Sequence, residues 1–394
     1  MNFQFKLRPA LAAVSSVVVL LAACGGGGEA TQDQASASGA TAAAAELARP
    51  MALMPGDTRV KWNPGHYIQL NAGATDSLVS YTFKEIAALP NVRGVQTRYM
   101  WRDLEPTKDG YDFSEIDKEV AMAQAVGKRL FIMVGTKAFK AGGRALPDYM
   151  HTAEYGGGVF RILIDGKDTL GTEDTTGENM AMYEPSVRDR MIALVTALGQ
   201  RYNGHNAFEG IAFNETALGQ AVVPLTSAQK QAFFDNLAQV DTATRRAFPN
   251  TVVMQFINFP RVYMPGLVNN ALNSGVALGG PDTFLNDSEL ELSAYPHYDT
   301  AAGKVPLGPS VQAENYVTTY QNGPYAPPPV TDLYAFAKNR LHANYIFWAK
   351  NSVAPLYAYN NVLNMFKSAS FPKDAAGGLA TTCPATFVSC VSKL

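Results

Sequence analysis

Short runs of apolar and β-branched residues recur along the chain, and helix-like amphipathic stretches follow them. Eight runs are typical of buried strands: His66–Leu70, Val92–Arg98, Arg129–Val134, Phe208–Asn214, Thr251–Ile257, Val276–Gly280, Val305–Ala313 and Ala343–Trp348. Helical patterns with Ser, Thr or Pro near their starts occupy Ser114–Val126, Ser186–Tyr202, Ser227–Ala247 and Thr331–His342. Alternating strands and helices indicate a parallel sheet. Eight such units predict an α/β fold, a (β/α)8 TIM barrel in a single domain.

Two loops are expected to shape one end of this barrel. The segment between the third and fourth strands is long and contains Tyr155–Gly158 and the polar run Gly171–Asn179. It is expected to form a loop or small hairpin over the barrel mouth. A lid or cleft wall and a disordered insertion are both open interpretations. The loop Gln321–Val330 holds Tyr325 and three consecutive prolines, and we expect it to form a stiff wall near Glu314.

The first residues of the chain have the pattern of an export signal. Lys6 and Arg8 precede an apolar stretch, Ala10–Leu21, that is too short to span a membrane as a helix. Small residues then lead directly into Cys24, so residues 1–23 resemble a bacterial lipoprotein signal peptide. The resemblance implies cleavage before Cys24 and lipidation of that residue, and Gly25 after it implies the outer membrane. An ordinary secretory signal with an incidental cysteine is the alternative.

The chain after this signal divides into a tether and a folded domain. Residues 24–50 consist mainly of Gly, Ala, Ser, Thr and Gln, which cannot bury a core, so they predict a flexible tether. Residues 51–394 show no second linker and no internal repeat, and they predict the barrel domain. The mature protein would be exported and held to the membrane by its lipid alone.

Composition excludes several classes of function. The formal net charge is −2 with 17% charged residues and no basic stripe, which argues against a nucleic-acid partner. Only five histidines are present, without a His-Glu-x-x-His run or a cysteine cluster, so neither a metal site nor a cofactor is expected. A Gly-x-Ser-x-Gly nucleophile motif is absent. Cys383 and Cys390 bracket a short loop and are expected to pair as a disulfide in an exported protein.

Polar and aromatic residues follow the predicted strands at their carboxyl ends. These residues are Arg98, Asn214, Glu215, Asn258, Asp282, Glu314 and Trp348. In a TIM barrel this end carries the active site. Two carboxyl groups on different strands suit glycoside hydrolysis, in which one protonated acid serves the leaving oxygen and one carboxylate lies near the anomeric carbon. Glu215 and Glu314 are the candidate pair.

These motifs resemble those of the clan A glycoside hydrolases. The resemblance rests on Asn214-Glu215 after a fourth strand, on Glu314 after a seventh, and on Trp348 at the eighth. The stretch from Trp101 to Asp117 is similar to the one after the second strand in many of these enzymes. The match covers most of Tyr67 to Trp348 as a pattern and does not define one family within the clan.

The resemblance implies a role for each matched residue. It implies that Glu215 is the acid/base and Glu314 the nucleophile, with retention of anomeric configuration. It further implies that Asn214 binds the sugar 2-hydroxyl, that Arg98 lies near the nucleophile, and that Trp348 forms a platform beneath the sugar. Trp101, Asn258, Asp282 and Gln312 complete the expected substrate-binding set. The sixth strand departs from the clan pattern, which leaves Asp282, His297 and Tyr298 open.

The sequence therefore predicts a retaining glycoside hydrolase that acts on a polysaccharide or oligosaccharide. Structural roles for the two acids remain open, because Glu215 could cap a helix and Glu314 could stand in the first turn of one. A non-catalytic carbohydrate-binding lipoprotein and an envelope transglycosylase are the alternative functions.

Overall fold

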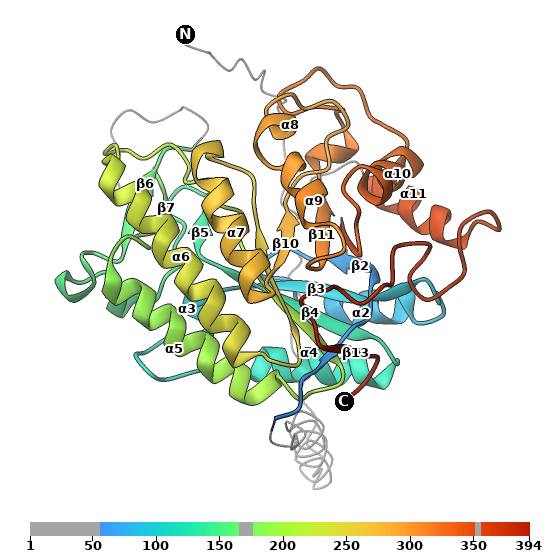
Figure 1. Cartoon of the computed structure of the whole chain (residues 1–394), viewed down its shortest axis with the longest axis horizontal. Helices are drawn as coiled ribbons and strands as arrows, with labels where there is room; N and C mark the ends of the chain where they lie inside the picture. The colour runs from blue at the N-terminus through green and yellow to red at the C-terminus, as the bar shows by residue number, and fades with distance from the viewer. Residues whose placement is uncertain (1–55, 165–175, 351–355) are drawn as a thin grey trace, which may run out of the picture.

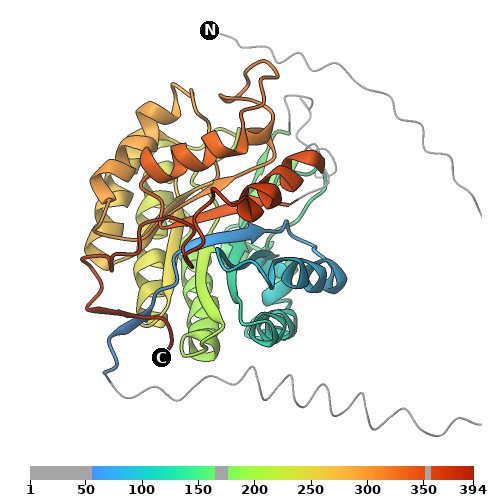
Figure 2. The same cartoon turned by 90° about the vertical axis from the view of Figure 1, so that its right-hand side faces the viewer.

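A closed barrel of parallel strands forms the centre of the molecule. The computed structural model describes residues 56–164, 176–350 and 356–394. Within them, eight parallel strands close into a ring with helices around its outside (Figure 1 and Figure 2). In order around the ring they are β2 (Gly65–Gln69), β3 (Val92–Met100), β4 (Arg129–Gly135), β8 (Phe208–Phe213), β9 (Val252–Phe256), β10 (Ala277–Gly280), β11 (Leu307–Val311) and β12 (Tyr345–Ala349). Each coincides with a predicted run, so the prediction of a TIM barrel is confirmed.

Helices connect most consecutive strands, as parallel pairing requires. They are α2 (Asp76–Ile86), α3 (Trp101–Leu104), α4 (Ser114–Ala125), α5 (Pro185–Tyr202), α6 (Ser227–Ala247), α7 (Met264–Ser274), α8 (Leu290–Ser293), α9 (Tyr295–Ala301), α10 (Val330–Asn339) and α11 (Leu356–Lys367). A capping box fixes the start of α6, where Thr226 and Gln229 each bond the other's backbone N–H through their side chains. None of the helices in the described ranges is long and apolar enough to cross a membrane.

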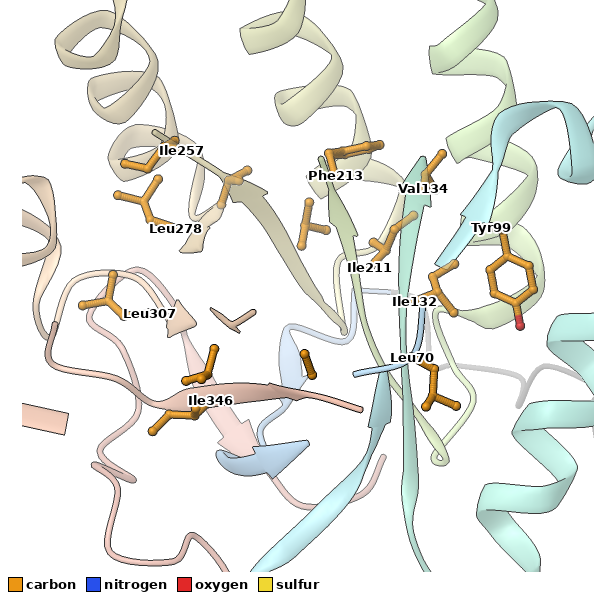
Figure 3. Close-up of a cluster of buried hydrophobic side chains, with 14 of the residues drawn as sticks. Leu70, Tyr99, Ile132, Val134, Ile211, Phe213, Ile257, Leu278, Leu307 and Ile346 are labelled. Atoms are coloured by element: carbon orange, nitrogen blue, oxygen red, sulfur yellow. The ribbon is translucent and has the colours of Figure 1, made fainter. Parts of the chain in front are cut away.

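The side chains of the barrel strands alternate between two environments, because successive residues of a strand point to opposite faces. One set points outward and packs under the helices. Figure 3 labels members of it on or next to every barrel strand: Leu70, Tyr99, Ile132, Val134, Ile211, Phe213, Ile257, Leu278, Leu307 and Ile346. The other set fills the interior with aromatic rings, and the ring centroids of Phe131 and Phe347 lie 5.1 Å apart. The barrel is therefore a packed core, and ligands are confined to its ends.

The amino ends of the strands form the base of the barrel. Glu209 is fully buried there, and its Oε1 accepts hydrogen bonds from the Tyr345 hydroxyl at 2.8 Å and from the Asn63 backbone N–H at 2.7 Å. β1 (Arg59–Lys61) and β13 (Ser389–Val391) pair in parallel at this end. The first and last described strands thus join beneath the barrel, and the carboxyl ends of the barrel strands form the opposite face.

A disulfide closes the loop that leads into β13. Cys383 and Cys390 are bonded, with their Cα atoms 5.7 Å apart. The Trp62 Nε1–H donates to the Thr381 carbonyl at 2.8 Å, which ties the preceding residues of this tail to the base. Other long-range contacts also hold this tail: the Asn344 side chain donates to the Ala380 carbonyl, the Ala385 backbone N–H donates to the Gly303 carbonyl, and the Phe387 ring packs against Trp62.

The long insertion after β4 forms a small sheet of its own. β5 (Lys137–Ala138), β7 (Gly177–Met180) and β6 (Val159–Ile162) pair antiparallel in that order, and they lie toward the upper left of the barrel in Figure 1. The predicted hairpin is thus present in the described part of the insertion. Most of the polar run from Gly171 lies outside the described residues, as do the signal peptide, Cys24 and the tether.

Replacing Cys383 and Cys390 together with serine is expected to lower the free energy of unfolding by roughly 2–3 kcal/mol, because the open loop regains entropy in the unfolded chain. Urea unfolding of the variant and of the oxidised wild type measures the difference. The reduced wild type serves as the control and should match the variant. Equal stability of the variant and the oxidised protein would contradict the tail's dependence on this bridge.

Candidate active site at the mouth of the barrel

Glu215 is held at the carboxyl end of the fourth barrel strand by a buried lysine. It lies two residues after β8, and its side chain is 14% exposed. The Lys137 Nζ lies 3.2 Å from Glu215 Oε1 and also donates to the backbone carbonyls of Glu215 and Ala217. These three acceptors satisfy the three N–H donors of the ammonium group. Lys137 is therefore bound as a cation although its side chain is only 2% exposed.

The charges around Glu215 keep it ionised. Burial alone would raise the pKa of this carboxyl, but the positive charges of Lys137 and Arg98 outweigh burial and lower it. Arg98 points into the upper part of the barrel from β3, and burial lowers the pKa of its guanidinium, partly offset by the charge of Glu215. At neutral pH, Glu215 is therefore a carboxylate between two cationic groups.

Asn214 is fixed beside Glu215 by the neighbouring strand. Its Oδ1 accepts from the Thr136 backbone N–H at 2.8 Å, and its carbonyl accepts from the Gln255 side chain at 2.7 Å. The Asn214 Nδ2 makes no hydrogen bond to the part of the chain that the structure describes. The amide is thus oriented by the barrel with its donor group left for a ligand.

Asp282 occupies a different environment at the end of the sixth barrel strand. It lies two residues after β10, is partly exposed, and lines a small hollow. The other lining residues are Ile257, Gly280, Pro281, Leu290, Ala294, Tyr295 and Tyr298. Burial, with the negative charges of Glu215, Glu314 and Asp287, raises the pKa of Asp282 to about 8. This carboxyl is therefore largely protonated at neutral pH.

Glu314 lies at the same mouth but is exposed. It follows β11 and begins a single turn of 3-10 helix, Glu314–Tyr316, which agrees with the alternative that placed it in a first helical turn. Its charge contributes to the raised pKa of Asp282, as does the charge of Glu215. Asp282 therefore lies within electrostatic reach of both Glu215 and Glu314 at the barrel mouth.

A chain of side-chain amides crosses the floor of the mouth. The Gln312 Nε2 donates to Gln69 Oε1 at 3.0 Å, and the Gln69 Nε2 donates to Gln96 Oε1 at 2.8 Å. These residues come from the ends of β11 and β2 and from the middle of β3. Gln312 is partly exposed above this chain, so the structure brings it to the mouth as the sequence suggested.

Trp348 does not form a platform in the mouth. It is fully buried, its Nε1–H donates to His66 Nδ1 at 3.1 Å, and its ring meets Phe366 of α11 edge to face. The expectation placed Trp348 at the end of its strand, but β12 continues to Ala349. Alternation then turns Phe347 inward and Trp348 outward. Trp348 is therefore part of the packing between the barrel and α11.

Trp101 and Asn258 also have structural environments. Trp101 is fully buried, and its Nε1–H donates to Glu105 Oε2 at 2.9 Å. Asn258 is 6% exposed, and its Oδ1 accepts from the backbone N–H groups of Ala217 at 2.9 Å and Phe259 at 2.7 Å. Asn258 thus links the ends of two neighbouring strands. Trp101 lacks the exposure that the substrate-binding expectation requires, whereas Asn258 is exposed to the same small extent as Asn214, 6%.

The sequence analysis missed one residue of this site, Lys137, and left another, Tyr298, open. Lys137 stands directly after a buried strand in the predicted barrel, and a lysine at such a strand end was the available signal. Tyr298 lines the hollow beside Asp282, and its hydroxyl is buried without a hydrogen-bond partner in the described ranges. His297, the other residue left open, does not line that hollow.

No metal-binding cluster is found in the described part of the chain. Groups of three or more His, Cys, Asp or Glu side chains with suitable spacing do not occur there. Of the three carboxyl groups at the mouth, Glu215 lies near Lys137 and Arg98, whose positive charges lower its pKa.

Known structures share this barrel. No protein-family model and no curated protein sequence matches the chain. The catalytic domain of β-amylase from Paenibacillus polymyxa is similar with a TM-score of 0.51 at 9% identity, over 77% of this chain and 98% of that one. β-Galactosidase from Bacillus circulans sp. alkalophilus gives 0.55 at 10% identity, over 78% and 56% of the two chains. β-Galactosidase from the psychrophilic Marinomonas ef1 gives 0.51 at 10% identity, over 78% and 62%.

These similarities define the fold. The chain shares its closed eight-stranded parallel barrel with these structures. It spans less than two thirds of the length of the two β-galactosidases. At identities of 9–10%, the comparisons carry no residue assignments, so the chemistry must be argued from the site itself.

Replacing Lys137 with methionine is expected to raise the pKa of Glu215, because burial then opposes ionisation with only Arg98 against it. Carbon-13 NMR titration of the glutamate carboxyl groups measures the change. Lys118→Met, which removes an exposed lysine paired with Glu115, is the matched control and should leave Glu215 unchanged. An unaltered Glu215 titration in the Lys137 variant would show that the ion pair does not set its charge.

Proposed function

We propose that this protein is a retaining glycoside hydrolase that cleaves O-glycosidic bonds of a polysaccharide or oligosaccharide by double displacement. The observation that carries the proposal is that Glu215 and Glu314 follow the fourth and seventh strands of one closed barrel, so that both carboxyl groups lie at the same mouth. Glycosidic cleavage requires a protonated acid and an ionised carboxylate in one site. The barrel shared with the β-amylase and β-galactosidase structures supports this class of chemistry by analogy of fold.

Glu215 and Glu314 are the two acids on which we expect turnover to depend. Glu215 follows the fourth barrel strand and Glu314 the seventh, the positions that the resemblance to the clan assigns to its catalytic pair. Double displacement needs a carboxylate that bonds to the anomeric carbon and is later released by water. Glu314 is exposed at the mouth, where a sugar can approach it. Asn214 and Arg98 face the same region and supply hydrogen-bond donors for sugar hydroxyls.

Exposed aromatic rings near the mouth favour a carbohydrate ligand. Phe139 follows Lys137 by two residues and is 54% exposed, and Tyr325 in the proline-rich loop is 67% exposed. Flat apolar rings suit the apolar faces of sugars. We propose that Phe139 takes the platform role that Trp348 lacks.

We further propose that the protein is exported and anchored by lipid on Cys24, with residues 24–50 as a tether and the outer membrane as its location. The Cys383–Cys390 bond supports an oxidising compartment. Radiolabelled palmitate should enter the wild type and not a Cys24→Ala variant. Equal labelling of both would reject the anchor.

Glu215→Gln and Glu314→Gln are each expected to reduce hydrolysis of aryl glycosides by about 10²–10⁴-fold or more, because each removes a carboxyl group that the mechanism uses. A panel of aryl glycosides and polysaccharides, read by released chromophore and reducing ends, identifies the substrate first. Glu115→Gln makes the same chemical change on the surface of α4 and is the matched control. Wild-type turnover in both active-site variants would overturn the proposed function.

The product mixture separates hydrolysis from the alternatives. Proton NMR of the first product formed should show retained anomeric configuration. Transfer of the sugar to a second sugar would favour a transglycosylase. Saturable oligosaccharide binding in a calorimeter without any product would favour a carbohydrate-binding protein.

A further inference from the structure

The small sheet β5–β7–β6 extends into the segment that carries Glu215. Beyond the end of β8, Ala221 forms an antiparallel bridge with Ile162 of β6. Two backbone hydrogen bonds flank this bridge, from the Leu163 N–H to the Gln220 carbonyl at 2.8 Å and from the Val222 N–H to the Arg161 carbonyl at 2.9 Å. Residues 220–222 therefore continue the small sheet along the outer edge of β6.

One face of the small sheet directs polar side chains at the same segment. Lys137 of β5 and Asn179 of β7 are cross-strand partners, so their side chains lie on one face. The Lys137 Nζ bonds Glu215 Oε1 and the carbonyls of Glu215 and Ala217. The Asn179 Nδ2 donates to the Leu218 carbonyl at 3.0 Å. Four consecutive residues from Glu215 are thus bonded to this face or lie between residues that are.

The opposite face fixes the small sheet to the rest of the insertion. Glu178 precedes Asn179 in β7, so its side chain points the other way. Glu178 is fully buried, and its Oε1 accepts from the backbone N–H groups of Ala145 at 2.6 Å and Leu146 at 3.2 Å. Its Oε2 lies 3.1 Å from His151 Nε2. With both faces bonded, the small sheet has little freedom to shift against the Glu215 segment.

These contacts leave one oxygen of Glu215 available. Lys137 bonds Oε1, whereas Oε2 accepts no hydrogen bond from another residue within the part of the chain that the structure describes. The side chain is 14% exposed at the mouth. A carboxyl group held through one oxygen presents the other in a defined direction, which is what proton transfer to a bound substrate requires.

We propose that the small sheet positions Glu215 for proton transfer, with Lys137 as the positioning residue that fixes Oε1 and directs Oε2 toward the leaving oxygen of the glycosidic bond. The inference rests on the proposed function and deepens it. Lys137 makes no contact with the sugar and acts through Glu215.

The proton moves between Glu215 and the substrate in both steps of double displacement. In the first step the proton on Glu215 passes to the glycosidic oxygen, which also takes the electrons of its bond to the anomeric carbon, while the Glu314 carboxylate bonds to that carbon. In the second step water attacks the anomeric carbon and gives a proton to Glu215, and the electrons of the ester bond return to Glu314. Each transfer depends on where Oε2 lies.

Leaving-group dependence tests this role. The probes are a 2,4-dinitrophenyl glycoside, whose leaving group departs without a proton, and an alkyl glycoside of the same sugar, whose leaving group needs one. Lys137→Met should lower kcat/KM for the alkyl glycoside by about 10²-fold, because a misdirected carboxyl group transfers its proton poorly. The dinitrophenyl substrate should keep nearly its wild-type kcat/KM. The ratio of the two rates, measured on one preparation, does not depend on the fraction of the protein that is folded.

The pH profile separates position from charge. Removal of the ammonium raises the pKa of Glu215, so the change of charge alone would leave more of this carboxyl protonated and would raise the alkyl-glycoside rate. A lower rate at the maximum of the profile, with the basic limb moved to higher pH, therefore reports a change of position. Lys118→Met, on the surface of α4, is the matched control and should show the wild-type profile.

Asn179→Ala weakens the support without changing a charge. It removes the bond to the Leu218 carbonyl and leaves Lys137 in place. The alkyl-glycoside kcat/KM should fall by roughly 10-fold, with an unaltered dinitrophenyl rate and an unshifted pH profile. A wild-type ratio of the two rates in this variant would contradict the support that the small sheet is proposed to give.

Two results for Lys137→Met would overturn the inference and leave the proposed function standing. One is an equal loss on both substrates, which would indicate a general disturbance of the site. The other is an alkyl-glycoside rate at or above that of the wild type while Glu215→Gln still loses it. Failure of the wild type to cleave any glycoside would instead reject the proposed function, and this inference with it.

Discussion

Closure of the barrel is the constraint on which the rest of the molecule depends. When eight parallel strands pair into a ring, alternate side chains must enter an interior too narrow for anything but packing. In this chain the interior is filled by the rings around Phe131 and Phe347. Polar chemistry is thereby confined to the two ends. The base uses its buried Glu209 for hydrogen bonds that join the first and last segments, and the mouth collects the remaining carboxyl groups.

At the mouth, Glu215 and Asp282 differ more in their neighbouring charges than in their positions on the barrel. Glu215 and Asp282 each follow a barrel strand by two residues. Glu215 lies near Lys137 and Arg98, whereas Asp282 lines the hollow that Ile257, Leu290 and the two tyrosines also line. The lysine comes from the insertion after β4, which places the small sheet β5–β7–β6 in direct contact with the site. The insertion therefore contributes to the chemistry as well as to the shape of the mouth.

The sequence predicted the fold well because the barrel repeats one simple pattern. Eight apolar runs separated by amphipathic helices are compatible with few folds other than a barrel. Once the barrel is assumed, the residues that follow each strand are expected at its mouth. Single positions were less predictable. Trp348 was assigned to the mouth because it closed the predicted run, but alternation along β12 turns Tyr345 and Phe347 inward and Trp348 outward. The ionisation of Asp282 depends on α8 and α9, whose packing against its strand no local pattern reveals.

The parallel pairing of β1 with β13 determines at which end of the barrel the chain enters the fold. The chain enters the described fold at the base, where the Cys383–Cys390 loop also lies, and the carboxyl groups open at the far end. A molecule attached to a surface through its upstream residues would therefore be attached at the end of the barrel opposite its carboxyl groups.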